Sequence, residues 1–125
     1  MNVTLWIVQG LLALMFSMAG FMKMSKPREV LREKLGDWVD QFSDSSIKLI
    51  GLAEVLGAFG LILPMAIGFL PILTPAAGIG LALTMFGAMK VHLQRNEKSK
   101  MIANVVLMLL AVFVVVGRLY FVPTV

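Results

Sequence analysis

Four long apolar runs divide the sequence, and they constrain the fold more than any other feature. They cover residues 3–22, 47–63, 71–91 and 101–118. A helix needs about 20 apolar residues, with a range of about 17 to 25, to cross the hydrocarbon core of a bilayer. Only 14% of the residues are charged and 59% are hydrophobic, which is far more apolar surface than a soluble domain of this size can bury. The sequence therefore predicts an all-α polytopic membrane protein, a single domain over residues 1–125 with a bundle of four transmembrane helices.

The basic residues predict the orientation of these helices. Ten of the eleven lie in or beside the first and third loops: Lys23, Lys26, Arg28, Arg32, Lys34, Lys48, Lys90, Arg95, Lys98 and Lys100. The second loop, LPMAIGFLP, carries none. Because short loops rich in Lys and Arg stay in the cytoplasm, we expect loops one and three to be cytoplasmic and both termini to be outside. We expect the first run to be a retained span rather than a signal peptide, since no basic residue precedes it and it continues directly into Lys23.

The first loop contains an amphipathic segment over residues 27–42. Its apolar side chains recur at helical spacing, and they are Leu31, Leu35, Trp38, Val39 and Phe42. This pattern predicts a short interfacial helix at the inner membrane surface, anchored by Trp38 and Phe42. Two roles are equally open for its apolar side, which could cap the end of the bundle or bind a partner. Gly36 is the predicted weak point of this helix.

Glu54 lies in the middle of the apolar segment KLIGLAEVLGAFG, residues 48–60. A carboxylate there costs about 2.5 to 3.5 kcal/mol unless it is protonated, paired or hydrated. We expect Glu54 to face the bundle interior, with Lys23 or His92 as its partner. Both lie nearer the inner mouth by roughly 9 Å, from the helical rise per residue. Direct contact therefore requires the lysine to reach inward or a water to bridge.

Three segments carry a resemblance to a known family. FSMAGFMK at 16–23, GLAEVLGAFGLILP at 51–64 and GAMKVHLQRNE at 87–97 resemble the DoxX-like family of small four-helix membrane proteins, in order and spacing along nearly the whole chain. The resemblance implies a four-helix membrane fold, and we expect a bacterial cytoplasmic membrane as the location. It marks Lys23, Glu54 and His92 as polar family positions, and Gly20, Gly51 and Gly57 as helix-packing positions. It implies little about activity, because relatives include subunits linked to thiosulfate and quinone oxidation and, more distantly, a receptor chaperone.

The polar side chains of the four helices can gather in the inner half of the bundle. The candidate ligand-binding residues are Glu54, Lys23, His92 and Asn104 for a polar group, and Phe16, Met85 and Met89 for an apolar body. Each polar residue also has a structural alternative. Glu54 could be a hydrogen-bonded tie between helices, Lys23 a snorkelling anchor and His92 an interfacial residue. Arg118 is interpreted as an outer interfacial anchor.

The residue types narrow the functional classes. Cysteine is absent and histidine occurs once, which excludes disulfides, thiolate metal sites and a bis-histidine haem. We predict no metal site, no catalytic residue and no nucleic-acid partner. We favour the interpretation that the isolated chain has no enzymatic activity. Three functions remain: binding of a small amphipathic or lipid-like molecule around Glu54, a non-catalytic quinone-site subunit of a redox complex, and an assembly factor for another membrane protein. The ligand candidates are a quinone or a lipid, and the partners are the lipid bilayer, another membrane protein or further copies of this chain.

Overall fold

The computed structural model describes residues 1–123, and all its regular structure is helical. Four long helices form the bundle: α1 (Asn2–Ser25), α3 (Asp44–Ile67), α4 (Leu73–Gln94) and α5 (Lys98–Val116). A short helix α2 (Arg28–Leu35) and a 3-10 turn η1 (Asp37–Gln41) occupy the first loop, and a π-helical turn η2 (Gly117–Phe121) extends α5. The predicted all-α bundle of four spans with a short helix in loop one is confirmed.

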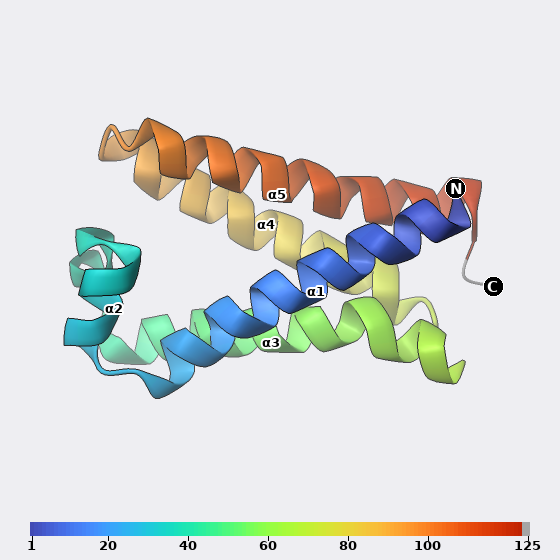
Figure 1. Cartoon of the computed structure of the whole chain (residues 1–125), viewed down its shortest axis with the longest axis horizontal. Coiled ribbons are helices and arrows are strands. Elements are labelled where there is room, and N and C mark those ends of the chain that lie inside the picture. The colour runs from blue at the N-terminus through green and yellow to red at the C-terminus, as the bar shows by residue number, and fades with distance from the viewer. Residues whose placement is uncertain (124–125) are drawn as a thin grey trace.

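The long helices are arranged as two pairs, α1 against α3 and α4 against α5, joined by contacts between α3 and α4. Figure 1 shows the pairs converging at the end where α1 begins and η2 follows α5, and diverging toward the end that carries α2. At the first end, which we call the terminal end, α1 and α5 also touch, because Gly117 leaves room for Leu5. The other end, occupied by α2, η1 and the α4–α5 loop, is called the loop end.

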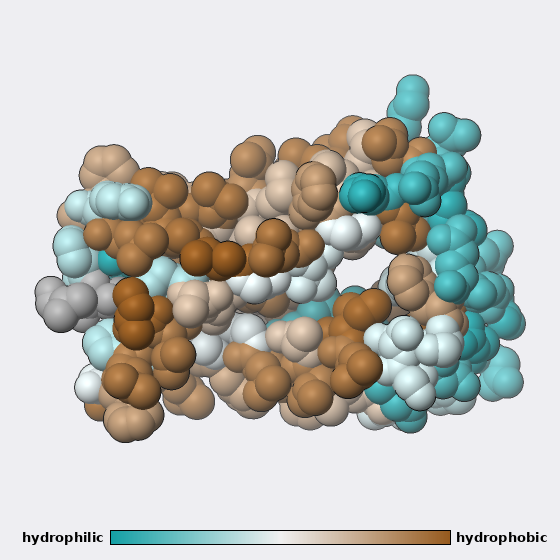
Figure 2. Space-filling view, turned by 180° about the vertical axis from the view of Figure 1, so that it is seen from behind, coloured by the Kyte–Doolittle hydropathy of each residue, from teal (hydrophilic) through white to brown (hydrophobic). Residues whose placement is uncertain are grey.

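The outer surface of the long helices is apolar. All four are long and apolar enough to cross a membrane, and large hydrophobic side chains such as Ile7, Leu83 and Leu109 are more than half exposed. Figure 2 shows hydrophobic residues along the helices, and hydrophilic residues gathered most densely over the loop end. Such a surface is stable in contact with lipid, whereas in water it would be an aggregation hazard.

Helix α3 is longer than the predicted span over residues 47–63. It begins at Asp44 because the Ser43 side chain accepts a hydrogen bond from the backbone N–H of Ser46 at 3.1 Å. It continues past Pro64, although a proline has no N–H to bond the carbonyl four residues earlier. That carbonyl, on Gly60, instead accepts a hydrogen bond from the Thr74 hydroxyl of α4 at 2.9 Å. The proline therefore does not end the helix, since α4 satisfies the freed group.

The loop-one helix breaks at Gly36, as expected. Gly36 has a φ of 118°, a conformation that glycine adopts without strain. Across the break, Arg32 of α2 binds Asp40 of η1 through two nitrogen–oxygen contacts of 3.0 and 2.8 Å. These hydrogen bonds to Arg32 favour the charged carboxylate and lower the pKa of Asp40.

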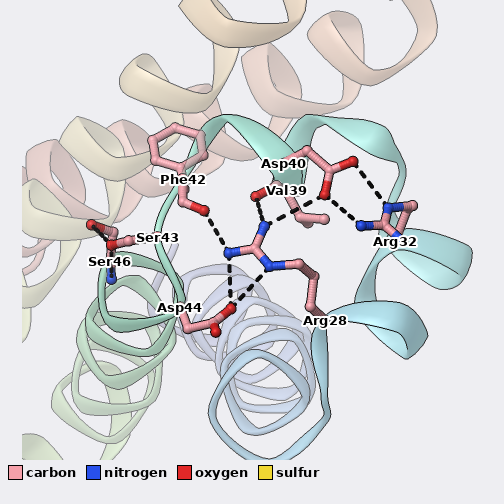
Figure 3. A network of polar contacts seen from close by, with 8 residues as sticks. All are labelled: Arg28, Arg32, Val39, Asp40, Phe42, Ser43, Asp44 and Ser46. Carbon is pink, nitrogen blue, oxygen red and sulfur yellow. Dashed lines mark hydrogen bonds and ion pairs between the residues drawn. The ribbon is translucent and has the colours of Figure 1, made fainter.

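Arg28 fastens this loop to the start of α3 (Figure 3). Its two terminal nitrogens donate to the carbonyls of Val39 and Phe42, each at 2.7 Å, and its Nε donates to Asp44 at 3.0 Å. One guanidinium thus holds three segments together, which its planar fork of donors allows.

Trp38 and Phe42 point into the bundle rather than outward as membrane anchors. Both line an interior cavity, and with Leu35 they pack against a small core that contains Leu31 and Val39. The apolar side of loop one therefore covers the loop end of the bundle, which favours the capping role over the partner-binding role. The same apolar side chains could be buried either in the membrane surface or against the helix ends, and in this structure they are buried against the helix ends.

Candidate functional site

A cavity of about 640 Å³ lies between the two helix pairs, next to the loop end. Its volume falls within the range of about 300 to 1,000 Å³ that is typical of small-molecule sites. Six residues singled out from the sequence line it: Phe16, Lys23, Glu54, Met85, His92 and Asn104. Met89, the seventh, is half-buried and lies outside the lining. Figure 2 shows an opening between the pairs, beside the hydrophilic end, through which the background is visible.

Lys23 and Glu54 form a buried ion pair in the wall of this cavity. Lys23 Nζ lies 2.5 Å from Glu54 Oε1, and the side chains are 10% and 2% exposed. The lysine reaches inward because side chains on a helix lean toward the N-terminus, which for α1 is the terminal end. The contact is direct, so Lys23 is neither a snorkelling anchor nor dependent on a bridging water.

Close approach of α1 and α3 makes this pair possible. Gly20 and Gly51 face each other, and a Cβ built on either glycine would lie 2.5 to 2.7 Å from the backbone oxygen of the other. Gly57 allows a similar approach between α3 and α4, since its Cβ would lie 2.7 Å from the Leu81 side chain. All three predicted packing glycines therefore lie at helix contacts, where a larger residue would force the backbones apart.

His92 belongs to a second polar group, at the mouth of the cavity. Glu97 Oε1 lies 3.0 Å from both His92 Nδ1 and Arg95 Nε, and Lys100 Nζ lies 3.4 Å from the other carboxylate oxygen of Glu97. Hydrogen bonds, first of all from His92, lower the pKa of Glu97 to about 2, so it is a carboxylate at ordinary pH. Lys100 also donates to the Leu35 carbonyl at 3.0 Å, which joins loop three to loop one.

Trp38 separates the two polar groups. Its ring meets the His92 ring edge-on with centroids 5.9 Å apart, and Lys23 Nζ lies 5.9 Å from the Trp38 ring centroid. Its indole N–H is used, because it donates to the Leu35 carbonyl at 3.1 Å. Within residues 1–123 Glu54 is bonded to Lys23 and not to His92.

Asn104 is a polar residue in the wall with weak internal contacts. Its Nδ2 donates only to the Met85 sulfur, at 3.8 Å, and sulfur is a weak acceptor. The Asn104 amide can therefore bond a ligand at little cost. Phe16 and Met85 supply apolar wall beside it and join the buried core.

Arg118 also lies elsewhere than the sequence analysis predicted. It is 1% exposed rather than an interfacial anchor, and it donates to Gln9 Oε1 at 2.8 Å and to Asn2 Oδ1 at 2.7 Å. Gln9 in turn donates to the Leu61 carbonyl at 2.5 Å, and the guanidinium carbon lies 5.4 Å from the Trp6 ring centroid. This network ties α1, α3 and α5 together at the terminal end, far from the cavity.

The chain offers no preformed metal site in the part that the structure describes, since no three His, Cys, Asp or Glu side chains cluster there. The cavity has apolar walls, with a buried ion pair on one side and an imidazole and an amide on the other.

Comparison with known proteins gives one match. A sequence profile of the DoxX-like family matches residues 7–114, a range that includes all the residues singled out from the sequence as ligand-binding or packing positions. No curated protein and no solved structure matches the chain. The profile match and the four apolar helices together identify an integral membrane protein.

Proposed function

Because the chain belongs to the DoxX-like family of membrane proteins, we propose that it binds a small amphipathic, lipid-like molecule in the cavity around Glu54. The observation that carries the proposal is the cavity itself, about 640 Å³ in volume and placed between two helix pairs whose outer surfaces are apolar.

The lining offers both apolar surface and polar groups, as an amphipathic molecule requires. Phe16 and Met85 belong to the apolar part, and Lys23, His92 and Asn104 provide polar groups. Glu54 holds the Lys23 ammonium in place through the 2.5 Å contact, and the lysine keeps two further N–H donors for a ligand. An amphipathic molecule would satisfy both parts, whereas a wholly polar or wholly apolar one would satisfy only one.

The position of the opening supports entry from the bilayer. The opening in Figure 2 lies on the side of the molecule, between the apolar surface of the helices and the hydrophilic end. Leu83, which lines the cavity, is 66% exposed. A lipid-like molecule would reach the site by lateral diffusion, without leaving the membrane.

Mass spectrometry of the protein after gentle detergent extraction tests this proposal. Wild-type protein should retain a lipid-like molecule, and Ala19→Phe, which places a large ring in the cavity wall, should lose it. Ala66→Phe is the matched control, because Ala66 is exposed and lines no cavity. Equal retention by all three proteins would contradict the proposal. A retained quinone would favour the redox-subunit alternative, and a co-purifying membrane protein without a small molecule would favour the assembly factor.

A further inference from the structure

The charged residues that line the cavity are unbalanced. They are three lysines, Lys23, Lys34 and Lys100, and one glutamate, Glu54. The glutamate is committed to Lys23 through the buried ion pair. Two lysines therefore remain at the cavity without an acidic residue in its lining.

Their surroundings do not neutralise these two lysines. Lys34 makes no ion pair or side-chain hydrogen bond within residues 1–123. Lys100 contacts Glu97 at 3.4 Å, but the same carboxylate is 3.0 Å from Arg95. One carboxylate is thus shared by two cations, and the mouth of the cavity keeps an excess of positive charge.

The backbone of loop one holds Lys100 at this position. Its ammonium donates to the Leu35 carbonyl at 3.0 Å and lies directly against Gly36, where any side chain would collide with it. The break between α2 and η1 thus serves a second purpose, since it provides the space that the lysine occupies. A long flexible side chain is thereby fixed beside the cavity before any ligand arrives, which reduces the entropic cost of binding.

From this charge distribution we infer that the ligand carries an anionic head group, a carboxylate or a phosphate, which binds between Lys34 and Lys100 at the mouth of the cavity. This inference rests on the proposed function and specifies the chemistry of its ligand. The apolar chain extends past Trp38 toward Phe16 and Leu83, and from there to the lateral opening. Asn104 and His92 lie along the same cavity, where an amide and an imidazole can form further hydrogen bonds with the head group.

Trp38 provides a direct readout, because it lines the cavity while Trp6 lies at the terminal end. The experiment uses the Trp6→Phe protein in nanodiscs of phosphatidylcholine, so that Trp38 is the sole tryptophan. The probes are a long-chain carboxylate brominated in mid-chain, the alkyl phosphate of equal length and the uncharged primary amide, each of which quenches tryptophan on contact. The Trp38→Phe protein, with Trp6 alone, measures non-specific quenching from the bilayer.

We expect saturable quenching of Trp38, with the anionic probes binding roughly fivefold to tenfold more tightly than the amide, as two partly exposed charge contacts would give. The Lys34→Gln/Lys100→Gln protein should lose this preference and bind the amide unchanged. The Lys90→Gln/Lys98→Gln protein is the matched control, because it removes the same charge from exposed lysines that line no cavity. Lys34→Gln alone should reduce the preference for the anionic probes by less than the double substitution does. The relative affinities of carboxylate and phosphate then identify the head group.

Equal affinity for the anionic probes and the amide would overturn the inference and leave the proposed function intact. A preference that survives in the Lys34→Gln/Lys100→Gln protein, or falls equally in the control, would overturn the assignment to these lysines. Absence of saturable Trp38 quenching by every probe would overturn the inference and the proposed function together.

Discussion

Lys23 and Glu54 meet because each leans toward the N-terminus of its own helix. The helices α1 and α3 run in opposite directions (Figure 1), so the lysine leans toward the terminal end and the glutamate toward the loop end. Their charged atoms meet at 2.5 Å although the residues belong to different depths. Two buried charges are in this way compensated within the membrane.

This pairing predicts strong coupling between the two residues. Lys23→Met and Glu54→Gln should each lower the free energy of unfolding by about 3 kcal/mol, because each leaves a buried group without its partner. The double variant should be more stable than either single one, since it removes both charges. Thermal unfolding of the four proteins in one detergent measures the coupling, and additive losses would show that the side chains act independently.

The glycine contacts predict a graded series of substitutions. Gly57→Leu should cost about 1 to 3 kcal/mol by overpacking against Leu81, and Gly20→Leu should cost more, because a backbone carbonyl cannot rotate away. Gly10→Leu is the control, since nothing lies within 4 Å of its Cβ position. In detergent, Gly10→Leu should therefore be the most thermally stable of the three variants, Gly57→Leu intermediate and Gly20→Leu the least stable. If Gly57→Leu were as stable as Gly10→Leu, the α3–α4 contact at this position would be wrong.

The stability of the terminal end should depend on the shape of the Arg118 side chain as well as on its charge. Arg118→Lys should not restore the network, because an ammonium cannot span the Gln9 and Asn2 oxygens as the planar guanidinium does. We expect a loss of about 1 to 3 kcal/mol, the cost of unpaired buried polar groups. Hydrogen exchange of residues 2–9 should accelerate in this variant and not in Lys90→Met, which alters an exposed lysine. Unchanged protection would show that Arg118 does not hold α1.

Acid should weaken the contacts of the Glu97 carboxylate with His92, Arg95 and Lys100 at the cavity mouth. The pKa of Glu97 is about 2 in the folded protein, against its usual 4.5. A carboxylate whose pKa is lowered on folding stabilises the folded state, and this stabilisation is complete at pH values above the usual pKa. It is lost as the pH falls from about 4.5 toward about 2. Trp38 fluorescence in the Trp6→Phe protein should change over this window. Glu97→Gln should abolish the transition, whereas Glu33→Gln, on the exposed side of α2, should preserve it.

Topology is tested by cysteine labelling, since the chain has no cysteine of its own. Ser45→Cys and Ser99→Cys, both at exposed positions in the loop end, should be shielded from an impermeant thiol reagent in intact cells. Thr124→Cys should react; Thr124 lies outside the residues that the structure describes. The reverse pattern would invert the proposed orientation, in which loops one and three are cytoplasmic.

The sequence predicted the spans and six residues of the cavity lining, because inward-facing positions follow from helical periodicity. Glu54 and Lys23 were expected on inward faces, and only their direct contact required the close approach at Gly20 and Gly51. The inward position of Arg118 had a signal that was overlooked, because the face formed by Asn104, Met108, Ala111 and Val115 continues to residue 118 at the same spacing.

Other features depended on contacts between segments distant in the sequence. The predicted second span ended at residue 63, just before Pro64, and no local pattern shows that Thr74 would satisfy the freed carbonyl of Gly60. Trp38 is a residue type that often anchors helices at the membrane surface, but its side chain points into the space between the helix pairs. Met89 was assigned to the cavity with Met85, but the lining on α4 continues through Ala88 to His92, so Met89 is excluded by its direction around the helix and not by its depth.

The hydrogen bonds that join the helix pairs have a mechanical consequence. Thr74 joins α4 to α3 and Arg118 of η2 joins the end of α5 to α1, and both lie at the terminal end. At the loop end, Lys100 of α5 is joined to the Leu35 carbonyl of α2. A rotation of one pair against the other about the terminal end would displace the loop end most, so it would strain the contact of Lys100 with Leu35 before the other two.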